Sequence, residues 1–269
     1  MLRSPLKMVY AGYLGALLMG IVLGLMGGGG SILTVPILVY LFRLDMLTAT
    51  MYSLFTVGVV SAVGGLRSWR AGVDKQALLY FGLPSTLTVL STRMWLVPAI
   101  PDPLHFGGLS IARSWALLIL FAVLMMLAAT SMIRGRRTAA GSPGADRRMW
   151  LVPLGVGSGV ITGLLGAGGG FLIIPALVLL VGMPMHRAVG TSLLIIAANA
   201  LIGFTGDLVR GSALDLPFLL AFTAVASAGI LLGGRWSDRI PGERLRPAFG
   251  WFVLVMGLYI IGHELSAMT

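Results

Sequence analysis

Eight long apolar segments, joined by short connections that hold most of the charges, dominate this sequence. They cover residues 8–42, 47–66, 76–97, 111–133, 149–182, 187–206, 216–234 and 247–263. Charged residues make up only 10% of the 269 residues, against about 25% in soluble domains. So few charges do not cover the surface of a soluble protein of this length. We therefore exclude a soluble globular enzyme, a disordered chain and a disulfide scaffold, and expect a polytopic membrane protein.

The apolar segments are expected to be helical. Lipid admits only helices or closed barrels, and barrel strands would alternate in polarity over about ten residues, which these segments do not. The 19 Lys and Arg residues, which give a net charge of +10, lie in clusters between the segments. There they set the topology and contact anionic lipid headgroups. Membrane lipid, and not nucleic acid, is therefore the expected partner of these charges.

Residues that carry enzyme chemistry are scarce. The chain has no cysteine, and its three histidines, His105, His186 and His263, are far apart in the sequence. Intramembrane hydrolases need paired carboxylates, a serine with a histidine or lysine, or a metal site rich in histidine. No such arrangement is apparent in the apolar segments. We therefore expect no enzyme, no catalytic residue, no metal site and no cofactor.

An internal repeat divides the chain into two halves. When the chain is shifted by 139 residues, GIVLGLMGGGGSILTVP (20–36) aligns with GVITGLLGAGGGFLIIP (159–175). The same shift aligns Ala49, Ser53, Leu54, Gly64 and Gly72 with Ala188, Ser192, Leu193, Gly203 and Gly211. One register without gaps from position 20 to 72 indicates a duplicated unit, a common design among transporters. We expect a first membrane repeat at 1–134, a cytoplasmic basic linker at 135–148 and a second membrane repeat at 149–269.

The glycine-rich segments are too long for one straight span. Residues 8–42 would form a helix of about 52 Å, whereas the hydrocarbon core of a bilayer is about 30 Å thick. Four consecutive glycines lie at 27–30, and 166–170 holds four glycines and one alanine in the second copy. Glycine favours a break in a helix at such positions. Each segment is therefore either a tilted, broken span or a re-entrant hairpin whose glycine tip lies inside the membrane.

The distribution of Lys and Arg favours the hairpin. If each glycine-rich segment returns to its own side, most of the 19 basic residues, including those of 134–148 and 235–246, fall on one side. That side is cytoplasmic by the positive-inside rule. Each repeat then holds a glycine-broken, re-entrant helix pair plus three transmembrane helices, and this odd number makes the repeats inverted. The expected fold class is an all-α polytopic protein of the cell membrane, which is the inner membrane in a Gram-negative bacterium.

The glycine-rich signatures resemble those of a known family. GLMGGGGSILTVP and GLLGAGGGFLIIP are similar to the signature of the TauE/SafE family, also called the toluene sulfonate uptake permease family. AVGTSLLIIAANALIGFTG (188–206) resembles the segment that follows this signature, although the first copy departs from it and reads ATMYS at 49–53. The resemblance covers nearly the whole chain. It implies a membrane transporter of small anions, such as sulfite, sulfonates or other organosulfur acids.

Backbone N–H groups at the glycine breaks form the predicted anion site. A helix beginning near Ser31 and another near Phe171 would each point a partly positive N-terminus toward the membrane midplane. Glycine lets an oxyanion approach these N–H groups closely, without a lysine or arginine at the tips. Nearby hydroxyl and amide groups would complete the site. The predicted substrate-binding residues are Gly27, Gly28, Gly29, Gly30, Ser31, Ser53, Gly166, Gly168, Gly169, Gly170, Thr191, Ser192 and Asn199.

Four further glycines have a simpler explanation. Gly20 with Gly24, and Gly159 with Gly163, lie four residues apart, which is the spacing at which small residues let membrane helices approach closely. We therefore expect these glycines to pack helices together and not to contact a substrate.

Three charged residues, Arg93, Arg187 and Asp207, lie at the ends of predicted spans. Their charged groups are expected to extend to the lipid headgroups. Arg187 has a second interpretation, in which it attracts anions to the cytoplasmic entrance. No Asp or Glu lies in the middle of a predicted span, which leaves no place for a proton relay or a sodium site built on carboxylates.

Two other functions are compatible with the sequence. The cargo could be an organic anion without sulfur, or the chain could be a membrane accessory or assembly subunit that transports nothing. Saturable flux through the purified protein alone separates a transporter from a subunit of this second kind. The sequence does not specify an oligomeric state.

Overall fold

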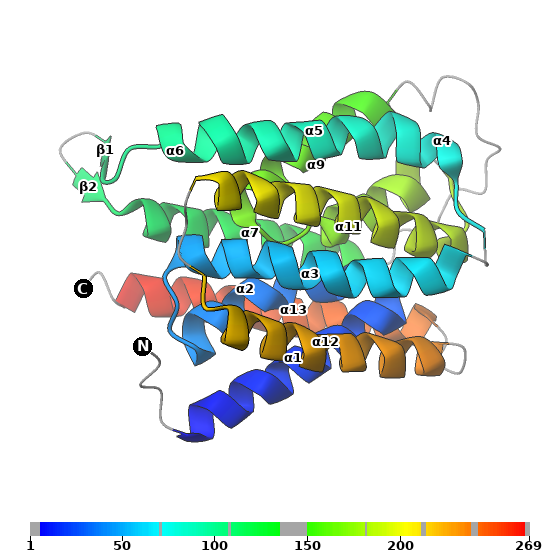
Figure 1. Ribbon diagram of the computed structural model, residues 1–269, viewed down its shortest axis with the longest axis horizontal. Helices are drawn as coiled ribbons and strands as arrows, with labels where there is room; N and C mark the ends of the chain where they lie inside the picture. The colour runs from blue at the N-terminus through cyan, green and yellow to red at the C-terminus, as the bar shows by residue number, and fades with distance from the viewer. Residues whose placement is uncertain are drawn as a thin grey trace.

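The protein is a bundle of long helices aligned along one direction, as seen in a computed structural model (Figure 1). The structure describes residues 6–69, 72–106, 109–134, 150–180, 182–210, 214–237 and 242–266. The strands among these residues are β1 (Leu104–Phe106) and β2 (Leu109–Ile111), a short antiparallel pair at one end of the bundle. The linker expected at 135–148 lies outside the described residues.

The first half of the chain holds a broken helix pair followed by three long helical segments. The elements are α1 (Leu6–Met26), η1 (Gly29–Leu33), α2 (Thr34–Pro36), η2 (Ile37–Leu41), α3 (Met46–Ser68), α4 (Lys75–Ala77), η4 (Leu78–Gly82), α5 (Leu83–Ser91), η5 (Thr92–Leu96), α6 (Val97–Ala99) and α7 (Arg113–Ile133). The residues of η1, α2 and η2 form one helical segment, 29–41, and those of α4 to α6 form a continuous helix, 75–99, with alternating α and π turns.

The second half repeats this order. Its elements are α9 (Leu151–Leu165), α10 (Gly170–Pro175), η6 (Ala176–Leu180), α11 (Met185–Val209), α12 (Leu216–Ser237) and α13 (Gly242–Ser266). The residues of α10 and η6 are continuous and form the segment 170–180. Both halves therefore begin with a helix, a glycine-rich break and a shorter helical segment.

Aspartates start two of the helices in the first half. Asp45 precedes α3 and accepts a hydrogen bond from the backbone N–H of Thr48 at 3.0 Å. Asp74 precedes the 75–99 helix and accepts hydrogen bonds from Gln76 and Ala77, both at 2.9 Å. Each carboxylate satisfies backbone N–H groups that have no partner within the helix. These caps define where the two helices begin.

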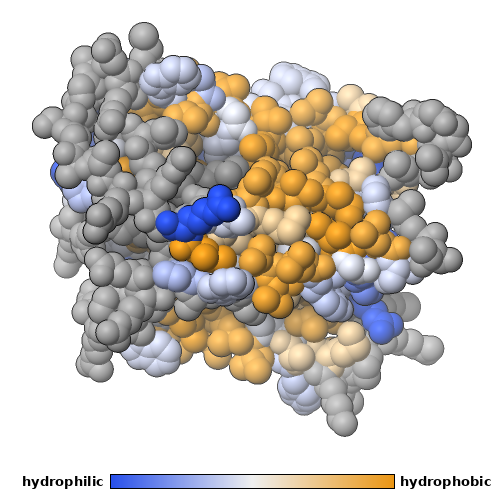
Figure 2. Space-filling model, turned by 180° about the vertical axis from the view of Figure 1, so that it is seen from behind, coloured by the Kyte–Doolittle hydropathy of each residue, from blue (hydrophilic) through white to orange (hydrophobic). Residues whose placement is uncertain are grey.

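Within the described residues, five helices are long and apolar enough to cross a membrane. They are Met8–Met26, Met46–Ser68, Arg113–Thr130, Arg187–Val209 and Leu216–Trp236. Large apolar side chains such as Leu87, Leu120 and Leu220 are exposed, and Figure 2 shows hydrophobic residues spread over the middle of the molecule. A surface of this kind suits lipid and not water. The prediction of a helical, multi-pass membrane protein is therefore confirmed.

Helix α1 runs parallel to α12. Gly20 packs against the backbone of Ala226, and Gly24 packs against the backbone of Ile230, so both residue numbers rise together. Figure 1 shows α12 and α3 starting from the same end of the bundle, which is also the end where the chain begins. Helices α1, α3 and α12 therefore share one direction.

Helix α9 runs in the opposite direction. It is parallel to the 75–99 helix, because Gly155 packs against Phe81 and Gly163 packs against Thr92. Figure 1 shows the 75–99 helix and α11 running together, from the end where α4 lies toward the end where α6 lies. Helix α11 is itself antiparallel to α3. The helices that begin the two sequence repeats, α1 and α9, are consequently antiparallel.

The closely spaced glycines pack these helices together, as the sequence predicted. A Cβ on Gly24 would lie 2.5 Å from the carbonyl oxygen of Ile230, and one on Gly159 would lie 2.5 Å from that of Ser85. Real Cβ atoms do not approach other atoms so closely, so only glycine fits at these contacts. Backbone contacts of this kind hold α1 on α12 and α9 on the 75–99 helix.

Candidate functional site

Both glycine-rich segments interrupt a helix near the centre of the molecule. Helix α1 ends at Met26, and Gly27 has a left-handed backbone with φ of 79°. Helix α9 ends at Leu165, where Gly166 and Gly168 both have φ of 66°. Residues with a Cβ are strained in this region, whereas glycine adopts it freely. The glycines therefore end each helix and turn the chain.

After the first break the chain runs back along the helix that it has just left. Gly30 packs on the backbone of Leu23, and the side chain of Ile37 lies beside Gly15, so one residue number rises as the other falls. In the second half, Gly169 packs against Thr162 of α9. The first glycine-rich segment is therefore a helical hairpin with its glycines at the tip, and Gly169 marks the corresponding turn in the second segment.

The two hairpin tips meet. A Cβ on Gly28 would lie 2.6 Å from Cα of Gly170, so the two backbones are in direct contact. A Cβ on Gly168 would lie 3.6 Å from Cβ of Ser31 and 3.1 Å from the side chain of Ile196. The structure therefore brings four of the predicted site residues together, Gly28, Ser31, Gly168 and Gly170.

Helices α3 and α11 line this junction through equivalent faces. On α3, Thr50 contacts Gly166 and Val57 contacts Gly168, so Ser53 lies on the same helical face between them. The hydroxyl of Ser53 is buried and has no hydrogen-bond partner within the described residues. This unpartnered hydroxyl lies on the face toward the junction, where it is available to donate a hydrogen bond to a ligand.

The matching face of α11 is occupied differently. Val189 contacts Gly27 and Ile196 contacts Gly168, which places Ser192 on that face. The Ser192 hydroxyl donates to the carbonyl of Val189 at 2.9 Å, as serine in a membrane helix commonly does. In the same way, the Ser31 hydroxyl donates to the carbonyl of Gly28 at 2.8 Å.

Two predicted site residues make contacts away from the hairpin tips. The hydroxyl of Thr191 accepts a hydrogen bond from the backbone N–H of Asp74 at 3.0 Å, at the start of the 75–99 helix. The amide of Asn199 donates to the hydroxyl of Ser85 at 2.7 Å and accepts from that of Thr86 at 2.6 Å. Asn199 therefore links α11 to α5, and the sequence did not indicate this contact.

The expectation that Arg93 and Asp207 extend to the lipid headgroups is wrong. Only 1% of Arg93 is exposed, and its Nη1 lies 3.2 Å from a carboxylate oxygen of Asp207. The same Nη1 donates to the hydroxyl of Thr50 at 3.2 Å. The physical reason is that Arg93 lies six residues before the end of the continuous 75–99 helix, and so lies between helices. Arg187, by contrast, is exposed at the start of α11.

A buried arginine also lies at one glycine tip, which the sequence did not predict. A Cβ on Gly166 would lie 2.7 Å from Nη2 of Arg93, so the guanidinium packs directly on the left-handed turn. Nε and Nη2 of Arg93 are buried and have no hydrogen-bond partner within the described residues. One edge of the guanidinium is therefore unpaired, although neighbouring groups cover its atoms.

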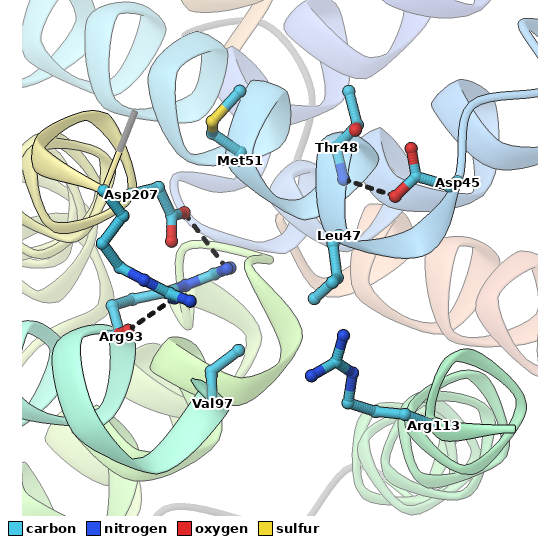
Figure 3. Close-up of a pocket in the computed structure, with 9 residues that line it drawn as sticks. Asp45, Leu47, Thr48, Met51, Arg93, Val97, Arg113 and Asp207 are labelled. Carbon is cyan, nitrogen blue, oxygen red and sulfur yellow. Dashed lines mark hydrogen bonds and ion pairs between the residues drawn. The ribbon is translucent and has the colours of Figure 1, made fainter. Parts of the chain in front are cut away.

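A cavity of about 360 Å³ leads to this arginine (Figure 3). Its lining holds three arginines against two aspartates. The lining residues are Asp45, Leu47, Thr48, Met51, Arg93, Val97, Arg113, Asp207 and Arg210. Two of these arginines are held in place at its rim, because Arg113 lies 3.7 Å from Asp102 and Arg210 donates to the carbonyl of Arg93 at 3.4 Å. With Asp102 counted, three arginines stand against three aspartates, and Arg210 has no carboxylate partner among the described residues.

The described residues hold no group of three or more His, Asp or Glu side chains that could bind a metal ion. The polar groups that converge near the hairpin tips are instead backbone, hydroxyl and guanidinium groups. Such groups act as hydrogen-bond donors to oxygen atoms.

Comparisons with known proteins agree with this architecture. A family model described as "Sulfite exporter TauE/SafE" matches residues 13–260. A "Probable membrane transporter protein" of Xylella fastidiosa (strain Temecula1 / ATCC 700964) is 30% identical over 266 residues, which cover 94% of each chain. "Probable membrane transporter protein YdhB" of Bacillus subtilis (strain 168) is 24% identical over 247 residues, covering 91% of this chain and 96% of the relative. No solved structure matches the chain. With the model matched from the first helix to the last and transporters similar along nearly their full length, the chain belongs to the TauE/SafE family of membrane transporters.

Proposed function

We propose that this transporter carries small oxyanions, namely sulfite, sulfonates or other organosulfur acids, and binds them where the two glycine hairpins meet. The observation that carries this proposal is the contact between Gly28 and Gly170, which brings both breaks to one place. Helical segments 29–41 and 170–180 begin there, and the first N–H groups of a helix have no partner within it. Such N–H groups bind anions, and the partial positive charge at the start of a helix makes anion binding more favourable.

The hydroxyl of Ser53 supports the same proposal. It is buried on the α3 face that contacts both Gly166 and Gly168, and it has no partner among the described residues. A sulfite or sulfonate group has three oxygens, so it can accept hydrogen bonds from several directions at once. The family model's description names sulfite export, which agrees with an oxyanion of this size.

The glycine hairpins are proposed to be re-entrant, and the two repeats to be inverted across the membrane. In support, the first glycine segment runs back along α1, and α1 and α9 run in opposite directions. The two described ends of the chain lie at one end of the bundle in Figure 1, and α7 ends at the other. We assign the end where α7 and α12 finish to the cytoplasm, because 134–148 and 235–246 are rich in Lys and Arg. The proposed domains remain 1–134, 135–148 and 149–269.

Flux through the purified protein tests the proposal. The protein is reconstituted alone into liposomes, and uptake of sulfite, methanesulfonate and sulfoacetate is compared with uptake of acetate and of potassium ions. Saturable flux of the sulfur oxyanions, with counter-transport, is expected, whereas protein-free liposomes and potassium give none. Flux of acetate alone would show a carrier of carboxylates. No flux of any anion through folded protein would favour an accessory subunit and overturn the proposal.

A further inference from the structure

Arg93 is buried, charged and incompletely paired. Asp207 and Thr50 both contact its Nη1 atom, at 3.2 Å each, while Nε and Nη2 have no hydrogen-bond partner within the described residues. A buried guanidinium with unpaired N–H groups is costly, because each lost contact with water is left uncompensated. Groups of this kind in a native structure take a further partner, which can be a ligand, an ion or a water molecule.

The unpaired atoms have the geometry that recognises an oxyanion. Nε–H and Nη2–H point from the same edge of the planar guanidinium, and two oxygens of one carboxylate, sulfite or sulfonate group fit such an edge in a bidentate manner. Asp207 and Thr50 hold the opposite side of the guanidinium and so fix its orientation. Lysine presents a point charge and does not offer this edge.

Arg93 lies between the cavity and the second glycine break. The guanidinium lines the cavity of about 360 Å³, together with Arg113 and Arg210. Its Nη2 also packs on Gly166, the first residue of the second glycine break. Figure 3 shows Arg93 and Asp207 side by side in the lining of this cavity, joined as an ion pair. The cavity lies at the end of the bundle where α6 and α11 finish and α3 and α7 begin.

We propose that the unpaired Nε–Nη2 edge of Arg93 is a second anion site beside this cavity, which a small movement of its neighbours opens, and that it binds the sulfite or sulfonate group on the path to or from the Gly28–Gly170 junction. Asp207 is a positioning residue in this site. This inference rests on the proposed function, because it assigns a cation to the same anion path. It adds a charged group to a path that the glycine backbone alone would leave without one.

The carboxylate of Asp207 makes the site distinguishable from a structural ion pair. Asn at position 207 can still accept a hydrogen bond from Nη1, but it removes a negative charge close to the incoming anion. Asp207→Asn is therefore expected to bind sulfite more tightly, whereas Arg93→Lys is expected to bind it at least about tenfold more weakly, as for other lost charge-assisted hydrogen bonds. A merely structural pair predicts that both variants are damaged in the same direction.

The experiment measures thermal unfolding of the full-length protein in detergent, with and without sulfite or methanesulfonate, and KM for anion flux in liposomes. Binding to the folded state raises the unfolding temperature, so the shift reports affinity without transport. We expect a larger shift for Asp207→Asn than for the native protein, and almost none for Arg93→Lys. Arg134→Gln, which removes an exposed arginine at the end of α7, is the control and should match the native protein.

If a single variant fails to fold, the double variant Arg93→Gln with Asp207→Asn tests whether Arg93 binds the anion. It removes both charges together, so it avoids leaving one buried charge alone. A folded double variant whose unfolding temperature does not respond to sulfite supports the site. A double variant with the native sulfite response and the native KM for anion flux overturns it. If the native protein moves no anion but shows the Arg93-dependent shift, the proposed function fails while the binding site stands.

Discussion

Gly28 and Gly170 touch through their backbones: a Cβ on Gly170 would lie 2.5 Å from Cα of Gly28. The two residues belong to different sequence repeats and to hairpins that enter the bundle along antiparallel helices, α1 and α9. Their contact leaves no room for a solute between the two tips. The structure therefore represents a state that is closed at its centre, with a cavity on the side of Arg93. If the anion crosses at this junction as proposed, the tips must separate during transport.

Gly170→Ala is expected to wedge the hairpin tips apart. The added methyl group overlaps the backbone of Gly28, and forcing extra atoms into a packed interior typically costs about 1–3 kcal/mol. We expect a lower unfolding temperature in detergent and loss of most anion flux in liposomes. Gly157→Ala is the matched control, because it is a glycine of the same hairpin with no atom within 4 Å of the added Cβ. Equal behaviour of the two variants would contradict the contact.

Gly166→Ala is expected to damage the site of Arg93 through the backbone. Gly166 has φ of 66°, where a residue with a Cβ is strained by about 1–2 kcal/mol. The new Cβ would also lie 2.7 Å from Nη2 of Arg93 and so displace the guanidinium. Sulfite should therefore raise the unfolding temperature of this variant much less than that of the native protein. The unfolding temperature without sulfite should fall by a smaller proportion. A variant with lower stability but a full sulfite response would argue against contact between the two residues.

The glycine content was sufficient to predict where the helices break. A 35-residue apolar segment with four central glycines fits no single straight helix, and α1 does end at Met26, one residue before Gly27. The same reasoning located the end of α9 at Leu165. Local backbone preference decides these positions, so no knowledge of neighbouring helices was needed.

The surroundings of the polar residues could not be predicted in the same way. Hydropathy treats the end of an apolar segment as a membrane boundary, which is why Arg93 and Asp207 were expected at headgroups. They are buried because the 75–99 helix and α11 run parallel and bring the two charges to the same depth. A signal was available, since opposite charges stood near the ends of two predicted spans. Nothing in one sequence showed which spans would pack together.

Asn199 illustrates the same limit and gives a further prediction. Its amide bridges the hydroxyls of Ser85 and Thr86, and Asn199→Ala leaves both hydroxyls of α5 without this partner. Leaving buried polar groups unsatisfied costs about 1–3 kcal/mol each. We expect a clear fall in unfolding temperature, together with a sulfite-dependent shift that is kept in full. Thr205→Ala on the exposed side of α11 is the control and should leave stability nearly unchanged, because only its bond to the carbonyl of Ile202 is lost.

The proposed topology is the easiest prediction to check, because the native chain contains no cysteine. Ser237→Cys lies at the end of α12, and Ser110→Cys lies in β2, at the opposite end of the bundle. With re-entrant hairpins, a membrane-impermeant thiol reagent applied to intact cells should label Ser110→Cys only, and inside-out vesicles should label Ser237→Cys only. The reason is that basic residues cluster at 235–246, which the positive-inside rule retains in the cytoplasm.

The same labelling experiment distinguishes the hairpin from a single broken span when a third site is added. Arg134→Cys lies at the end of α7, where the hairpin arrangement puts it on the same side as Ser237. In that arrangement α9 and segment 170–180 return to their own side, so only two full crossings, α11 and α12, lie between Arg134 and Ser237. An even number of crossings, α11 and α12 alone, then joins Arg134 to Ser237, so both should react from the cytoplasm. If the glycine segment crossed once, a third crossing would be added and the two cysteines would react from opposite faces. Labelling from opposite faces would therefore exclude the re-entrant hairpin in the second repeat.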